Sequence, residues 1–254
     1  MMNRSTSVRR VWRFIEWRQL PHGLLHTAVG WIWMISGGIW LWLLVNILSI
    51  QEGHHHHHMV TQVNGFFPQV SHWILMLIAM MFPLLMVQIN HVAFASPRFR
   101  RYQSVMLFLS GYSGLWLVFA TVFWGAQAAA NALGIDHGIY PIIGVSCFVL
   151  AALLVWSKNH PIVMASCNAT KSLSIQGWRA NMDCLLYGLK TAQNCIRSCG
   201  LPMLALMLTG HDFMLMFLVT LALWYERYCL PHLSKQMSVW WGLLAGITIA
   251  TTLL

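Results

Sequence analysis

The distribution of positive charge along the chain constrains its fold more than any other sequence feature. All 15 Lys and Arg residues lie in or beside alternate gaps between long apolar runs, whereas the intervening gaps Gln51–Ser71, Gly125–Gly138 and Gly210–Asp212 contain none. In multi-spanning membrane proteins, basic residues gather in the cytoplasmic loops. The pattern therefore predicts a multi-pass protein of the bacterial inner membrane, with a cytoplasmic N-terminus and an external C-terminus.

The composition supports a membrane environment. The chain is 58% hydrophobic and only 8% charged, which leaves too little polar surface for a soluble globule of 254 residues. Its net charge of +9 is explained by the cytoplasmic gaps, so we expect the lipid bilayer as a partner and no nucleic acid. All six cysteines fall in spans or on the cytoplasmic side, which argues against a disulfide framework and leaves free thiols or metal ligands.

The predicted fold class is all-α: a polytopic transmembrane helical bundle of about seven spans. Each apolar run has close to the roughly 20 residues that a helix needs to cross the hydrocarbon core. Neither an internal repeat nor a second domain is evident, so residues 1–254 are expected to form one helical domain. The predicted spans are Ala28–Ile50, His72–Ala95, Tyr102–Phe123, Ile139–Trp156, Leu185–Thr209, Phe213–Cys229 and Met237–Leu254.

The fifth run carries a stripe of residues that bind soft metals. Its members recur every four residues and therefore share one slowly winding face of a helix: Cys195, Cys199, Met203, Met207 and His211. Thiolate, thioether and imidazole groups are ligands for soft or borderline ions such as Cu(I). Cys and Met are also ordinary apolar filler inside helical bundles, so the stripe alone leaves metal handling and packing open.

A second stripe and a histidine run favour metal handling. His72, Met76 and Met80 share a face of the second predicted span. Consecutive imidazoles bind transition metals in almost any flexible context. We favour a natural origin for this external run over an engineered insertion, because tags are normally placed at a terminus. The run comprises His54, His55, His56, His57 and His58.

Two further patterns concern packing. Arg197 and Glu226 lie at nearly equal distances on either side of Gly210–Asp212, so two antiparallel helices would bring them to one depth as a structural ion pair. Residues 111–114, Gly-Tyr-Ser-Gly, match the GxSG of rhomboid-type proteases, but we favour close helix packing as their role. The sequence contains no HExxH, P-loop or dinucleotide fingerprint, which favours a protein without catalytic residues.

Several of these segments resemble a bacterial family of predicted metal-binding integral membrane proteins, a domain of unknown function. The resemblance covers about His72–Gly246 and implies a membrane-embedded helical fold that binds metal. It differs from the family at Ser198, where the family has an adjacent cysteine pair, and at Pro202. The resembling segments are the Met-rich residues 76–83, Gly111-Tyr112 with Trp116, Cys195 and Cys199 with Met203, Gly210, and Glu226-Arg227.

These patterns lead to two hypotheses about function. The first is an integral membrane protein that binds or relays a transition metal, with copper expected. External histidines would collect the ion, and the Met and Cys stripes would hold or pass it. The alternative is a non-catalytic subunit of a larger membrane metalloenzyme complex, with other membrane subunits as partners.

Overall fold

The protein is predominantly helical in the residues that its structure describes. The computed structural model describes residues 28–51, 66–134, 138–157, 160–174, 177–209, 213–228 and 234–253. Within these ranges there is no strand, which confirms the all-α prediction. The elements are α2 (Ala28–Gln51), α3 (Phe66–Met80), η3 (Phe82–Leu85), α4 (Met86–Ala95), η4 (Arg98–Arg100), α5 (Arg101–Ala132), α6 (Ile139–Val155), α7 (His160–Cys167), α8 (Gly177–Leu208), α9 (Phe213–Tyr228) and α10 (Ser234–Leu253).

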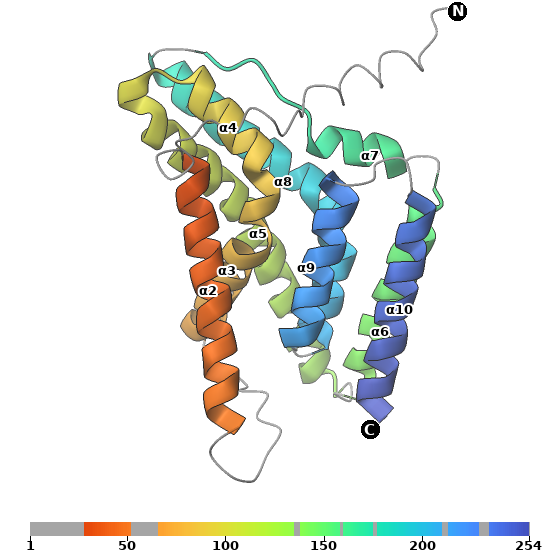
Figure 1. Cartoon of the computed structure of the whole chain (residues 1–254). Helices are drawn as coiled ribbons and strands as arrows, with labels where there is room; N and C mark the ends of the chain where they lie inside the picture. The colour runs from red at the N-terminus through yellow and green to blue at the C-terminus, as the bar shows by residue number, and fades with distance from the viewer. Residues whose placement is uncertain are drawn as a thin grey trace, which may run out of the picture.

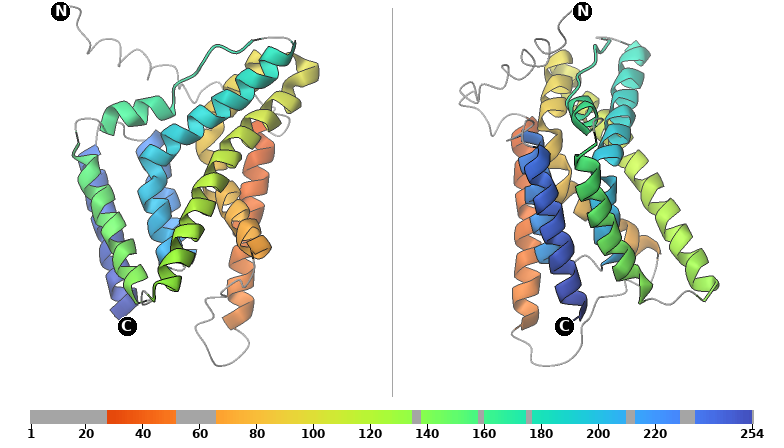
Figure 2. Two further views of the ribbon diagram at one scale, coloured as in Figure 1. Left: turned by 180° about the vertical axis from the view of Figure 1, so that it is seen from behind. Right: turned by 90° about the vertical axis from the view of Figure 1, so that its right-hand side faces the viewer.

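The long helices run alternately up and down the bundle, and the short helix α7 lies across one end of it (Figure 1). The most extensive contacts are those of α5 with α8, followed by those of α6 with α10 and with α8. Figure 2 shows α8 changing direction along its length. Pro202 lies inside this helix, and a proline removes one backbone hydrogen bond and bends a helix. The bend lies within the region that carries the predicted Cys and Met stripe.

Length and apolar composition alone identify few membrane-crossing helices among the described residues. Arg98–Ala132 passes as a single helix, and Gln69–Met80 with Phe82–Ala95 passes only as a pair bent by 48°. Shorter apolar helices occupy Gly30–Asn46, Ile139–Val155 and Gln236–Ala250. The seven-span arrangement therefore stays a prediction, although helices occupy every range in which the sequence predicts a span.

The outward faces of α5 and α6 carry large apolar side chains. In α6, Phe148 is fully buried, whereas Ile142 and Leu153 on other faces are 65% and 63% exposed. In α5, Val122 is 67% exposed. A helix on the surface of a soluble protein normally presents polar residues to water, and a helix that is hydrophobic all round is typical of a core or a membrane. Large apolar side chains on the outside are the surface expected against lipid.

Two glycines bring α5 and α8 into close contact. A Cβ atom at Gly111 would overlap the backbone carbonyl oxygen of Leu185, and one at Gly188 would overlap that of Phe108. Small residues at such crossings allow two helix backbones to approach each other. This explains Gly111 as a packing residue and supports that interpretation of the GxSG match. The close approach also places Tyr112 of α5 against the middle of α8.

Candidate metal site

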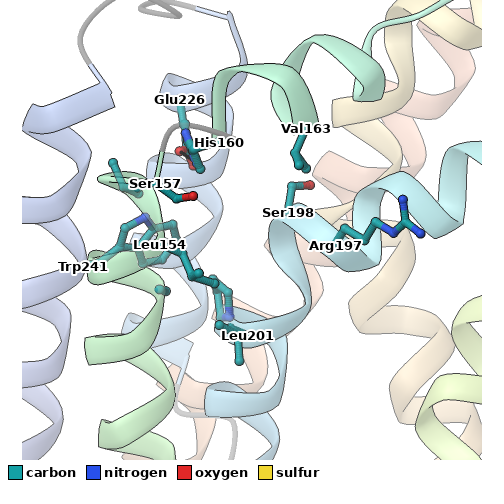
Figure 3. A pocket seen from close by; sticks show the side chains of 12 residues that line it. Leu154, Ser157, His160, Val163, Arg197, Ser198, Leu201, Glu226 and Trp241 are labelled. Carbon is teal, nitrogen blue, oxygen red and sulfur yellow. Dashed lines mark ion pairs between the residues drawn. The ribbon is translucent and has the colours of Figure 1, made fainter.

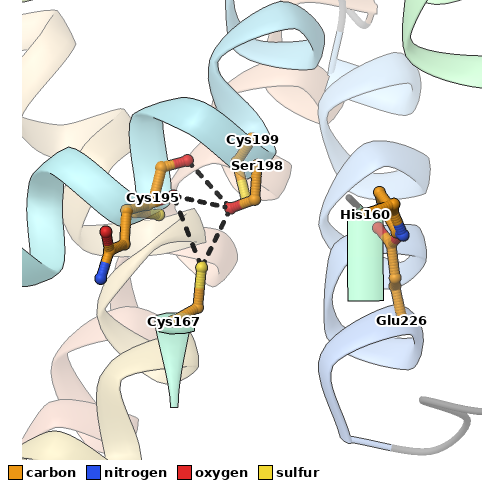
Figure 4. Close-up of polar contacts among 7 residues, drawn as sticks. His160, Cys167, Cys195, Ser198, Cys199 and Glu226 are labelled. Carbon is orange, nitrogen blue, oxygen red and sulfur yellow. Dashed lines mark hydrogen bonds and ion pairs between the residues drawn. The ribbon is translucent and has the colours of Figure 1, made fainter. Parts of the chain in front are cut away.

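Three buried thiols gather where α7 crosses α8. Cys167 ends α7, and Cys195 and Cys199 lie one turn apart on α8. Their exposed fractions are 2%, 0% and 4%. All three are free thiols. Figure 4 shows them around the hydroxyl of Ser198. We call these three residues the thiol cluster.

Hydrogen bonds fix the positions of these thiols. The Ser198 Oγ atom lies 3.3 Å from the sulfur of Cys167 and 3.3 Å from that of Cys199. The thiols of Cys195 and Cys199 also interact electrostatically with each other. Tyr112 donates a hydrogen bond from its hydroxyl to the sulfur of Cys195 at 3.2 Å. The cluster is therefore ordered by α5, α7 and α8 together.

The Cys167 thiol lies beside the two cysteines of α8. It donates a hydrogen bond to the carbonyl oxygen of Asn194 at 3.5 Å, in addition to its contact with Ser198. Burial raises the pKa of the Cys167 thiol, and the nearby positive charge of Arg227 acts in the opposite direction. The Cys167 thiol therefore ionises less readily than an exposed cysteine, since burial is the larger of these two effects.

A buried guanidinium stands beside the thiol cluster. Arg227 is only 5% exposed. Its Nε atom donates to Asn168 Oδ1 at 3.0 Å, and its Nη2 atom donates to the carbonyl oxygen of Cys167 at 2.9 Å. The guanidinium also interacts electrostatically with Cys195 and Cys167. A fixed positive charge therefore lies next to groups that become negative when they bind a metal.

The donor set fits a soft ion with few ligands. No group of three or more His, Cys, Asp and Glu residues is arranged to hold a metal ion within the described ranges. Cys195 and Cys199 nevertheless present two adjacent thiols on one helix face, and the fully buried Met203 follows one turn later. Thiolate and thioether sulfur atoms are the ligands that Cu(I) prefers. The pair suits Cu(I) better than an ion that demands four hard ligands.

The other predicted site residues are distributed through the bundle. Met207 is 9% exposed and continues the α8 stripe. Met76 and Met80 are buried in α3, whereas His72 lies on an exposed part of that helix. The helix α3 packs mainly on α2, η3 and α5, so the two stripes share one apolar core without forming a face-to-face pair. The predictions for His211 and for His54, His55, His56, His57 and His58 lie outside the described residues.

A cavity of about 220 Å³ adjoins the thiol cluster. Ser198 lines it and also contacts the sulfur atoms of Cys167 and Cys199. Its other polar lining includes Ser157, His160, Arg197 and Glu226 (Figure 3). The cavity therefore lies next to the thiol cluster and is lined by both polar and apolar side chains.

The predicted pairing of Arg197 with Glu226 is wrong. The Glu226 carboxylate lies 3.0 Å from His160 Nε2. Both residues still line the cavity, but in Figure 3 the Arg197 side chain points away from Glu226. The prediction placed the two residues at one depth and did not foresee α7, which inserts His160 into that space. His160, rather than Arg197, is therefore the partner of the Glu226 carboxylate.

Sequence reasoning missed three residues of this site. Cys167 was placed on the cytoplasmic side without a partner, because nothing in its local pattern shows that α7 folds back over α8. Tyr112 and Arg227 were noted only within motifs. The structure identifies Tyr112, because it follows a glycine that packs on α8. The sequence offers a signal for Arg227, because it is a charged residue in an apolar run. An ionisable residue inside such a run usually serves a partner or a site.

Comparison with known proteins links this chain to a copper-related family. No curated protein and no solved structure matches the chain. The family match is to a copper-related family, so it bears out the metal-binding part of the resemblance, whereas the integral-membrane part stays a prediction. The match is to a family described as "PpoB2: Copper chaperone" and extends over residues 70–251. The chain therefore belongs to the PpoB2 family of copper chaperones.

Proposed function

We propose that this protein is a membrane-embedded copper carrier that holds Cu(I) on the thiolates of Cys195 and Cys199. The observation that carries the proposal is the pair of free, buried, hydrogen-bonded thiols on one face of α8. A structural role in a disulfide is excluded for these two thiols as they stand. In a chain of a copper chaperone family, such a pair is the group best suited to bind copper.

The order of ligands along α8 supports a relay. Met207 and Met203 lie on the same face as Cys199 and Cys195 and are buried with them. Neutral thioethers bind copper more weakly than thiolates do, so the ligands strengthen toward Cys195. A copper ion that enters at the Met207 end would move toward the tighter site. The external histidines would collect the ion before it reaches this end.

The orientation of the membrane follows from the basic residues. The end of the bundle with α7 also carries Arg98, Arg100 and Arg101, so we propose that this end faces the cytoplasm. The apolar outward faces of α5 and α6 would then contact lipid. The cavity beside Ser198 would open the thiol cluster to polar ligands on the cytoplasmic side.

The test is the copper content at equilibrium of purified protein in which His54–His58 are replaced by Ser. This replacement removes the run that would otherwise bind copper by itself. Cys199→Ser and Met203→Leu are then introduced separately, and Met106→Leu serves as the matched control because Met106 is 66% exposed on α5. We expect lower copper in the first two variants and no change in the control. Equal copper in all variants, or none in any, would contradict the proposal.

A further inference from the structure

The environment of Arg227 bears on which ions the thiol pair accepts. This guanidinium is buried at the C-terminal end of α9, and no carboxylate forms an ion pair with it in the part of the chain that the structure describes. The neighbouring acid, Glu226, contacts His160 instead. A buried charge that lacks a counter-ion is costly, so such charges are normally paired. The groups that act electrostatically on Arg227 and can carry a negative charge are the thiols of Cys195, Cys167 and Cys199 and the hydroxyl of Tyr228, and a thiol ionises more readily than a tyrosine hydroxyl.

The hydrogen bonds of Arg227 leave it oriented toward that cluster. Neutral acceptors take two of its nitrogen atoms, namely Asn168 Oδ1 for Nε and the Cys167 carbonyl oxygen for Nη2. The Nη1 atom is buried and lacks an oxygen acceptor among the described residues. The guanidinium also interacts electrostatically with Cys195, whose sulfur accepts a hydrogen bond from the Tyr112 hydroxyl. Neutral groups thus hold Arg227 in place, and its positive charge lies beside the thiol cluster.

We propose that Arg227 sets the charge selectivity of this site, favouring monovalent Cu(I) over divalent ions such as Zn(II). The proposal rests on the proposed function of Cys195 and Cys199 as copper ligands. Two thiolates and one monovalent ion carry a net charge of about −1, which the guanidinium neutralises. Two thiolates and one divalent ion are neutral, so the buried charge of Arg227 then has no counterpart. Met203 does not alter this balance because a thioether is uncharged.

The effect on selectivity follows from Coulomb's law. A fixed positive charge repels a bound divalent ion about twice as strongly as a monovalent ion at the same position. The loss of thiol protons contributes equally to both affinities when the same two thiols bind, so it cancels in their ratio. The ratio of affinities therefore reports the charge of Arg227 directly. The absolute affinity does not, since Arg227 also stabilises the thiolates.

Ag(I) and Cd(II) are suitable probes for this ratio. The two ions have the same number of electrons and both prefer sulfur ligands, so they differ chiefly in charge and in preferred ligand number. The measurement is competition of each ion against a soluble thiol chelator, on full-length protein with His54–His58 replaced by Ser. Comparing variants of one site removes the contribution of ligand number, because Cys195, Cys199 and Met203 are unchanged in all of them.

Three variants separate charge from structure. Arg227→Gln removes the charge, and Arg227→Lys keeps it. Asn168→Asp places a carboxylate on Arg227 Nε with almost no change in shape, since Asn168 Oδ1 already lies 3.0 Å from that nitrogen. This variant neutralises the guanidinium without removing it and remains informative if Arg227→Gln does not fold.

We expect the Ag(I):Cd(II) affinity ratio to fall by about tenfold or more in Arg227→Gln and in Asn168→Asp, and to be kept in Arg227→Lys. The same ratio in the parent and in both neutralising variants would overturn the role of Arg227. A Cys195→Ser, Cys199→Ser double variant tests the proposed function separately from the role of Arg227. If it still binds Ag(I) as tightly as the parent protein, the thiols are not the site, and the proposed function fails together with this inference.

Discussion

The hydroxyl of Tyr112 donates a hydrogen bond to the sulfur of Cys195 at 3.2 Å, and this contact joins α5 to the face of α8 that carries the proposed copper ligands. Both side chains are fully buried. A buried thiol that accepts a hydroxyl hydrogen bond is fixed in direction, and the same bond would stabilise the thiolate that binds copper. The contact is possible because Gly111 and Gly188 allow the two backbones to approach each other.

Replacement of Tyr112 by Phe should therefore affect both stability and copper binding. Loss of this buried hydrogen bond should lower the free energy of unfolding by about 1 kcal/mol. Loss of the hydrogen bond to the Cys195 sulfur should weaken Cu(I) binding by about tenfold. Unfolding in detergent and competition with a Cu(I) chelator measure these two effects.

Tyr187→Phe is the matched control for this variant. The Tyr187 hydroxyl donates to the carbonyl oxygen of Ala169 at 3.2 Å, so its loss should cost a similar amount of stability. Copper affinity should be unchanged, because that bond does not reach Cys195 or Cys199. Equal copper affinities for the two variants would show that Tyr112 has no special relation to the site.

The glycine crossing gives a sharp test of the fold. Gly111→Ala places a methyl group on the Leu185 carbonyl oxygen and should destabilise the protein by about 1–3 kcal/mol. Gly114→Ala is one turn further along the same helix, where nothing lies within 4 Å of the added atom. The latter change should be neutral or stabilise the protein by up to about 1 kcal/mol. Similar losses in both variants would mean that α5 and α8 do not cross at Gly111.

The partner of Glu226 can be measured by double-mutant cycles. We expect His160→Ala and Glu226→Gln to show a coupling free energy of about 0.5–3 kcal/mol, because their side chains are in contact and largely buried. Arg197→Gln and Glu226→Gln should be additive within about 0.5 kcal/mol. Strong coupling of Arg197 with Glu226 would instead restore the pairing that the sequence alone suggests.

Much of the helical framework could be predicted from apolar runs, for a simple physical reason. Segments such as α2, α6 and α9 are bounded by polar or turn residues, so composition alone places their ends within a few residues of Gln51, Val155 and Tyr228. The prediction was less successful for α8. This helix begins at Gly177, eight residues before the predicted Leu185, because its first half is amphipathic and contains Arg179, Asp183 and Lys190.

Only part of the candidate site could be predicted from the sequence. Cys195 and Cys199 were found because residues four apart on a helix share a face. Cys167 and Arg227 join them through the path of α7 and the end of α9, and such long-range contacts leave no local periodic signal. The short helix α7 was missed for the same reason that His160 was: eight residues between basic segments do not form an apolar run.

Membrane topology is an independent prediction from the Lys and Arg pattern. Reporter fusions after Gln62 and at Leu254 should be external, and fusions after Arg101 and Lys235 should be cytoplasmic. The reason is that loops rich in Lys and Arg stay on the cytoplasmic side of the membrane. A cytoplasmic reporter at Leu254 would mean that one of the predicted spans does not cross the membrane.

The central claim is that the sulfur atoms of Cys195 and Cys199 hold copper. X-ray absorption at the copper edge tests it most directly, on Cu(I)-loaded protein with His54–His58 replaced by Ser. We predict a spectrum dominated by sulfur neighbours of copper in the parent protein. In the Cys195→Ser, Cys199→Ser double variant, we predict that these sulfur neighbours are lost. A spectrum with nitrogen or oxygen neighbours alone, or one that is unchanged in the double variant, would contradict the claim.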